Sequence, residues 1–268
     1  MGAVVALVAL AIGGVVFARG GEDETQERRD AVAAYIARVN TTQQSLIVER
    51  EQVSLAYREL RLRDTADPKE LARVVRAEQT LRGLHERLAA LPAPPEARKL
   101  RRLLLGLVEL QADLAEEVAG MARYIPFQAA ESRKLATATR ALQKSLQAAE
   151  TGAEQRRAFD VYDRTLRATV ERLEAAEAPA VLEPSRTREI ERLGRLADLS
   201  EQLGVALAAQ RAADVDRLFP RFVQVSASTG TTRAERDAVV AFNRRLAAIT
   251  DARQDVVAER ARVDLDVR

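Results

Sequence analysis

The sequence predicts an all-α protein, an elongated antiparallel bundle of about seven helices preceded by an N-terminal transmembrane or signal-anchor helix. Apolar residues recur at intervals of three and four along most of the 268-residue chain, which is the period of an amphipathic helix. Strong helix formers such as Ala, Leu, Glu and Arg dominate, and no strand-like alternation of apolar and polar residues persists. The first 18 residues carry no charged side chain, which sets them apart from the rest.

Residues 1–18 are close to the shortest apolar stretch that crosses a bilayer, because roughly 17 to 25 such residues are needed. Two other interpretations are a secretory signal and an apolar arm buried in a soluble protein. The small side chains of Val16 and Ala18 suit cleavage after Ala18, which would release a secreted protein. We expect a retained anchor that contacts membrane lipid, followed by a short connector over residues 19–26.

Two rules give opposite orientations for the large domain. Arg19, Arg28 and Arg29 follow the apolar segment and no basic residue precedes it, so the positive-inside rule places the domain in the cytoplasm. However, a hydrophobic N-terminus with a cleavage site is how exported domains are delivered, and long domains translocate largely regardless of charge. We expect the domain on the extracytoplasmic face of the cell membrane.

Residues 27–268 are predicted to form the helical-bundle domain. The first helix, at about 27–64, carries a heptad seam of apolar residues. Pro68 opens the second helix, with Asp67 as its cap, and this helix ends at Leu91. A third helix follows the Pro92–Pro95 loop, and Pro126 is predicted to separate it from a fourth that continues through Leu146.

The second half of the domain is punctuated in the same way. A fifth helix follows Gly152, and Ser185 is predicted to cap a sixth that continues to Leu207. The stretch 214–228 around Pro220 is predicted to be irregular. The C-terminal helix is expected at about 232–265.

An internal duplication is also predicted, because the chain matches itself after a shift of 89 residues. The matching pairs include the proline of each interhelical loop and a series of leucines: Pro95 and Pro184, Leu104 and Leu193, Leu107 and Leu196, Leu110 and Leu199. The repeat units are placed at about 27–125 and 126–212. Each could be a three-helix bundle stacked along an axis, as in spectrin-like repeats, or half of a longer antiparallel bundle, which the proline breaks favour.

Composition and motifs argue against catalysis. The chain has no cysteine, which removes thiolate metal sites and cysteine nucleophiles, and its single histidine, His85, is expected at the edge of a helix's apolar face. Neither a Ser-His-Asp set nor a glycine-rich phosphate loop is present. The 42 basic and 40 acidic residues nearly balance, which argues against nucleic acid as a partner. We predict no enzymatic activity, no cofactor and no metal site.

Four of the ten aromatic residues cluster at the two interior prolines. Tyr124 and Phe127 flank Pro126, while Phe219 and Phe222 flank Pro220. Irregular helix junctions with aromatic anchors are common recognition sites, so these four residues are a candidate partner surface; the alternative is that they plug the ends of the bundle.

Three charged residues occupy positions typical of a helix core. Glu49 lies on the seam of the first helix, and Arg253 and Arg260 lie on that of the last. Buried charges must be paired or hydrated, so we expect the first and last helices to pack together with Glu49 paired to one of these arginines. The alternative is that the seam opens to solvent at these positions.

Taken together, these features predict a membrane-anchored helical scaffold or interaction module that binds a protein partner. The alternative is an extracytoplasmic helical sensory or solute-binding domain. The two differ in what they retain, because a scaffold binds proteins whereas a solute binder is stabilised by its ligand.

Overall fold

The computed structural model describes residues 22–62, 68–228 and 231–267, and all regular structure within them is helical, as predicted. Its elements are α1 (Glu22–Leu62), α2 (Pro68–Ala90), the 3-10 turn η1 (Pro95–Ala97), α3 (Arg98–Ala148), α4 (Gly152–Ala175), α5 (Glu183–Ala208), α6 (Ala212–Ser226) and α7 (Arg233–Val267). The predicted anchor over residues 1–18 lies outside the described residues. None of the helices described is long and apolar enough to cross a membrane.

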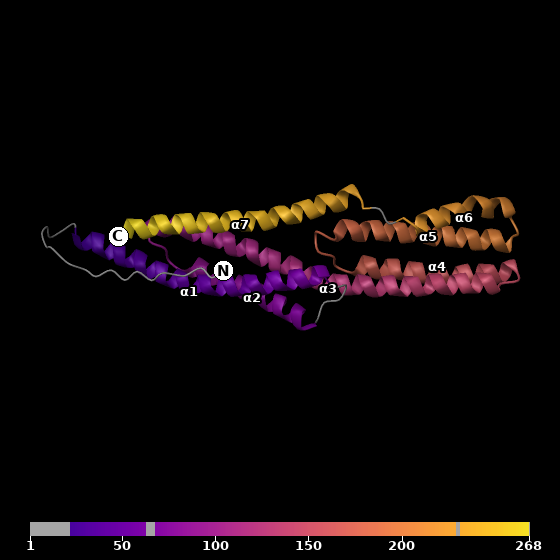
Figure 1. Ribbon diagram of the computed structural model, residues 1–268, viewed down its shortest axis with the longest axis horizontal. Coiled ribbons are helices and arrows are strands. Elements are labelled where there is room, and N and C mark those ends of the chain that lie inside the picture. Colours follow the sequence, from indigo (N-terminus) through magenta and orange to yellow (C-terminus); the bar gives the residue numbers. More distant parts are fainter. Residues whose placement is uncertain (1–21, 63–67, 229–230, 268) are drawn as a thin grey trace.

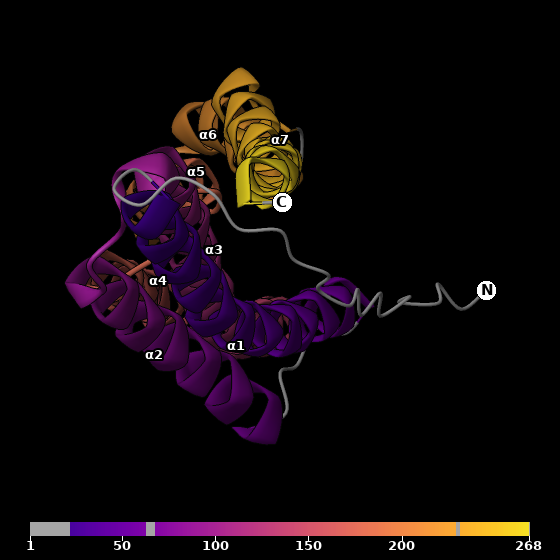
Figure 2. The same ribbon diagram turned by 90° about the vertical axis from the view of Figure 1, so that its left-hand side faces the viewer.

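The helices form a rod of two bundles placed end to end (Figure 1). The proximal bundle contains α1, α2, the first half of α3 and α7, whereas the distal bundle contains the second half of α3 with α4, α5 and α6. The last helix, α7, runs back antiparallel to α3 and closes the proximal bundle beside α1 (Figure 2). In the sequence, the distal helices α4 to α6 therefore lie between α7 and the other helices of the proximal bundle.

Helix α3 is shared by both bundles, which corrects the predicted break at Pro126. It runs for 51 residues with Pro126 inside it, a length of about 76 Å at 1.5 Å per residue. A proline within a helix removes one backbone hydrogen bond and costs about 3 kcal/mol. The burial of α3 on both sides of the proline, from Leu100 to Leu142, offsets this cost.

Two further predictions about helix ends are corrected. The stretch around Pro220, predicted to be irregular, belongs to the amphipathic helix α6, which buries Leu218. Ser185 does not cap α5, because that helix already begins at Glu183, with Leu182 at its N-cap. The Ser185 hydroxyl instead donates a hydrogen bond to the carboxylate of Glu235 on α7.

Each bundle has its own apolar core. The proximal core includes the fully buried side chains Val32, Val74, Leu81, Leu88, Leu100 and Leu104, and the distal core includes Phe159, Leu166, Leu173, Leu193 and Leu203. The separation of the cores along α3 explains why the molecule is a rod rather than a single sphere.

The contacts of the two bundles repeat after 85 residues rather than 89. The last residues of α2 and α4 are 85 residues apart, and so are the first residues of α3 and α5. Arg82 bridges Glu78 and Glu116 in the proximal bundle, and Arg167 makes the equivalent bridge between Asp163 and Glu201. Likewise, Arg101 binds carbonyls at the end of α2, and Arg186 binds those at the end of α4. A shift of four residues is about one helical turn, so both alignments superpose apolar faces.

Two glycines inside helices are positions at which alanine is expected to raise the free energy of unfolding. A Cβ atom added at Gly106 of α3 or at Gly194 of α5 would meet no other atom within 4 Å. Alanine is favoured over glycine in a helix by about 1 kcal/mol. We therefore expect Gly106→Ala to raise the free energy of unfolding by about 1 kcal/mol in urea denaturation followed by circular dichroism. A loss of stability would show that this part of α3 is less open than described.

Candidate functional site

The four aromatic residues predicted to form a partner surface lie in two separate places. Tyr124 and Phe127 stack at a centroid distance of 6.0 Å where α3 passes between the bundles. On α6, Phe222 packs edge-on against Phe159 of the distal core at 5.8 Å. Phe219 is 51% exposed, whereas Tyr124 is buried. The structure thus pairs Tyr124 with Phe127 but turns Phe222 into the distal core, and among the four Phe219 is the side chain that faces solvent.

Tyr124 is a structural anchor of the junction between the bundles. Its hydroxyl is buried and has no hydrogen-bond partner among the described residues. Burial raises the pKa of Tyr124 to about 12, although the nearby Arg186 guanidinium acts in the opposite direction. At neutral pH the phenol is therefore uncharged.

The expected pairing of Glu49 with Arg253 or Arg260 is not observed. Helices α1 and α7 do touch, and Tyr57 stacks on Phe242 at 5.4 Å. Among the described residues, however, Glu49 forms no ion pair with either arginine, and Arg260 contacts Asp264 one turn along its own helix at 3.8 Å. The physical reason is that α7 packs mainly along α3, so buried charges at the α3 interface are the ones that need partners.

Two buried carboxylates, one on α3 and one on α7, determine how these two helices align along their length. Glu117 of α3 is buried and accepts hydrogen bonds from Arg245 of α7 and from the backbone N–H of Val181 at 3.2 Å. Glu259 of α7 is also buried and pairs with Lys99 at the start of α3 at 2.8 Å. The two contacts lie at opposite ends of the α3–α7 interface, so sliding either helix by one turn would break both.

Glu131 of α3 joins the second half of that helix to α4. Its buried carboxylate accepts hydrogen bonds from Arg172 at 2.8 Å and from Lys134 at 2.7 Å. Desolvation by burial raises the pKa of Glu131, but the hydrogen bonds and charges of these two cations outweigh it and lower the pKa overall. The group is therefore a carboxylate at neutral pH.

Glu235 performs the same function between α7 and α5. It accepts the backbone N–H of Thr232, and its carboxylate pairs with Arg188 of α5 at 2.9 Å. Burial acts to raise its pKa, whereas these partners and Ser185 lower it overall. The sequence did not identify these buried carboxylates, because their burial depends on which helices pack together. For Glu117, its place within the leucine pattern of the third predicted helix was the available signal.

The Glu259 contact predicts how stability depends on pH. Hydrogen bonds from Arg262 and Lys99 lower the pKa of Glu259 from its ordinary 4.5 to about 2, against the opposing effect of desolvation. The ionised group therefore stabilises the fold above pH 4.5, and this contribution is lost as the pH falls toward 2. We expect Glu259→Gln to lower the melting temperature at pH 6, with a difference from the natural protein that shrinks between pH 4.5 and 2.

Asp255 on the same helix provides the control for this experiment, because it is exposed and forms no ion pair within the described structure. Asp255→Asn should leave the melting temperature nearly unchanged at both pH values. An equal effect of the two substitutions would mean that Glu259 is not specifically held.

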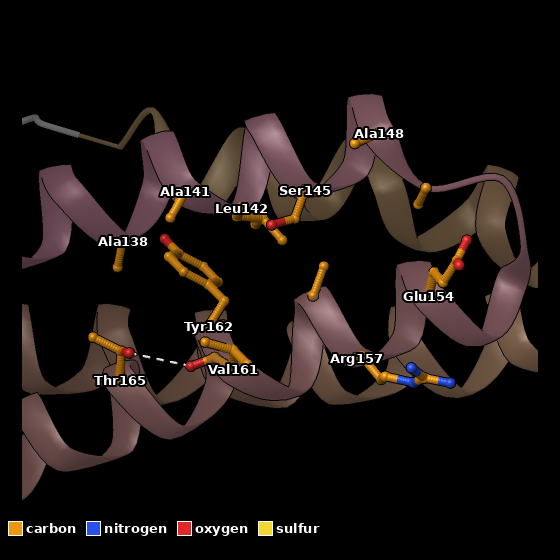
Figure 3. A pocket seen from close by; sticks show the side chains of 12 residues that line it. Ala138, Ala141, Leu142, Ser145, Ala148, Glu154, Arg157, Val161, Tyr162 and Thr165 are labelled. Carbon is orange, nitrogen blue, oxygen red and sulfur yellow. Dashed lines mark hydrogen bonds between the residues drawn. The ribbon is translucent and has the colours of Figure 1, made fainter.

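A groove of about 480 Å³ lies between α3 and α4 near the end of the distal bundle. Its floor is formed by Leu142 and by the ring of Tyr162, which points from α4 toward α3 (Figure 3). The walls are mostly small or apolar side chains, namely Ala138, Ala141, Ser145, Ala148, Ala158 and Val161. Val161, which lines the groove, is 55% exposed.

The single histidine, His85, lies half-buried on α2. Comparison with known proteins does not add a relationship, since no protein family, no curated protein and no solved structure matches the chain.

Proposed function

We propose that the chain is a non-enzymatic scaffold that is tethered to the membrane through residues 1–18 and holds a partner-binding groove away from the lipid. The observation that carries this proposal is the position of the groove. Glu22, the first described residue, starts at one end of the rod, whereas the α3–α4 groove lies near the other end (Figure 1). The uncharged stretch that precedes Glu22 supplies the tether.

The rod is suited to act as a spacer. One continuous helix, α3, spans both bundles, and ion pairs from its buried carboxylates tie it to α4 and α7. A hinge between the bundles would have to bend α3 and also break contacts that cross the junction. These are the hydrogen bond from the Val181 N–H to Glu117 and the ion pair of Arg188 with Glu235. These features support a fixed separation of about 76 Å between the ends of α3.

The groove suits an amphipathic helix of a partner protein. Small side chains on its walls permit close approach of a helix backbone, and the exposed Val161 and the floor residues offer apolar contact. Arg157 and Glu154 at one end could pair with charges that flank the apolar face of such a helix.

The tether is tested by deleting residues 2–18. The full chain is expected in the membrane fraction, and the deletion variant is expected in the aqueous fraction with an unchanged helical circular dichroism spectrum.

Because the chain has no cysteine, Ser132→Cys on the exposed side of α3 gives a single labelling site. Labelling of this variant by a membrane-impermeant maleimide in intact cells would support the extracytoplasmic orientation, and labelling only after lysis would reverse it.

The groove is tested by site-specific crosslinking. A photo-crosslinker attached at Ser145→Cys, inside the groove, should capture a defined partner in cells, whereas the same reagent at Ser132→Cys should not. Adding Val161→Glu to the Ser145→Cys variant places a charge on the apolar wall and should abolish the crosslink. Equal capture from both cysteines would contradict a specific groove.

A further inference from the structure

A second cavity, in the proximal bundle, has the properties of a small-molecule site. It occupies about 460 Å³ between α1, α3 and α7, with α2 at its base. This volume falls within the range of about 300 to 1,000 Å³ that is typical of ligand pockets. Aliphatic side chains from four helices line it, together with polar ones that include Ser54, Tyr57 and Thr250. The aliphatic residues are Val53, Leu81, Leu114, Val118, Leu246 and Ile249. We call this cavity the proximal cleft.

One buried polar side chain lines the proximal cleft, beside exposed ones such as Ser54 and Thr250. Gln111 of α3 is only 6% exposed, and its side-chain oxygen has no hydrogen-bond partner among the described residues. A buried polar atom without a partner is costly, and such an atom in a natural protein calls for an explanation. Rotation of the carboxamide can turn either its oxygen or its N–H₂ group toward a molecule in the cleft.

The mouth of the proximal cleft carries unpaired positive charge. Arg50 and Arg58 lie two turns apart on α1, with Ser54 between them on the same face. Both guanidinium groups are exposed, and neither has a carboxylate partner within the described part of the chain. Glu51 is the one acidic residue that lines this opening. Arg82 and Arg167, by contrast, each pair with a neighbouring carboxylate.

From these three features we propose that the proximal cleft binds a small amphiphilic monocarboxylate. The carboxylate pairs with Arg50 and Arg58 at the mouth, because arginine forms strong charge-assisted hydrogen bonds with carboxylates. The apolar body of the ligand lies between Val53 and Ile249, and a donor or acceptor on that body meets Gln111. This site is independent of the distal groove, and ligand binding here would add to the proposed scaffold function rather than replace it.

Fluorescence gives a direct test, because the chain contains no tryptophan. Indole-3-propionate has an apolar ring, an N–H donor and a carboxylate, and its indole can be excited without protein background. The full chain in lipid nanodiscs should raise the anisotropy of the probe saturably, and empty nanodiscs should not. Indole-3-propanol, which lacks the negative charge, should bind at least about tenfold more weakly.

Variants then locate the bound probe. Arg50→Gln with Arg58→Gln should weaken binding about tenfold or more, whereas Arg38→Gln, an exposed arginine of α1 outside the cleft, should not change it. Ser54→Phe should block the mouth and abolish saturable binding. Gln111→Leu should remove the preference for indole-3-propionate over naphthalene-1-propionate, which lacks the N–H donor.

Several results would overturn the proposal. These are the absence of saturable binding up to about 1 mM for both carboxylates, equal binding by the double arginine variant, or binding that Ser54→Phe leaves unchanged. Binding that appears only after residues 2–18 are deleted would mean that this apolar segment occupies the cleft in the full chain. That result would also overturn the proposal. Circular dichroism of each variant verifies that a loss of binding is not a loss of fold.

Discussion

Replacing Gly152 with alanine is expected to lower the free energy of unfolding by about 3 kcal/mol. A Cβ atom at this position would overlap the carbonyl oxygen of Leu207 and would lie 3.1 Å from its carbonyl carbon and 3.5 Å from the Cα of Ala208. All three atoms belong to the backbone, so no side-chain rotation can relieve the overlap. The start of α4 would have to move away from the end of α5, which are the two most extensively packed helices.

The measurement is urea denaturation followed by circular dichroism, with Gly106→Ala as the matched control. The same substitution is expected to stabilise the protein at Gly106, where there is open space, and to destabilise it at Gly152. Opposite signs for one chemical change would establish that backbone contact, and not helix propensity, decides the outcome. If Gly152→Ala were as stable as the natural protein, the α4–α5 approach would be looser than described.

Replacing Arg172 with methionine is expected to cost about 2 to 3 kcal/mol at neutral pH. The change leaves the buried carboxylate of Glu131 without its partner on α4, while the apolar stem of the side chain is retained. Breaking a fully buried pair typically costs about 3 to 5 kcal/mol. The smaller figure is used here because Lys134 still contacts Glu131 and the Arg172 side chain is 41% exposed.

A pH series distinguishes this electrostatic cost from lost packing. Without Arg172, desolvation is no longer fully opposed, so the pKa of Glu131 should rise in the variant. A protonated Glu131 tolerates burial, so the stability gap between variant and natural protein should narrow as the pH falls from the pKa of Glu131 in the variant to its lower pKa in the natural protein. Glu131→Gln combined with Arg172→Met should be more stable at pH 7 than Arg172→Met alone. A gap that does not depend on pH would attribute the cost to packing.

The helical class and most helix ends could be predicted from the sequence, because they depend on local properties. Amphipathic periodicity defines each helix, and Pro68 and Gly152 do begin helices. The errors at Pro126 and Pro220 have one cause: a proline weakens a helix locally, but burial of long apolar faces on both sides of it holds the helix together. That burial depends on helices distant in sequence.

The candidate sites were harder to predict because they depend on helix pairing. Placing α7 against α3, rather than mainly against α1, determines that Glu117 and Glu259 find partners and Glu49 does not. The proximal cleft likewise combines Arg50, Gln111 and Ile249 from three helices that no local pattern relates. The aromatic clusters were visible in the sequence, but which of their rings would face solvent was not.

The return of α7 to the proximal bundle also has a consequence for biosynthesis. A ribosome delivers α3 to α6 before α7, so the distal bundle can assemble while translation continues. The proximal bundle must wait for residues 233–267 before its last wall is in place, with the seam of α3 that receives α7 uncovered until then. Nascent chains stalled between α6 and α7 should therefore resist proteolysis in their distal part and remain cleavable in α1 and α2.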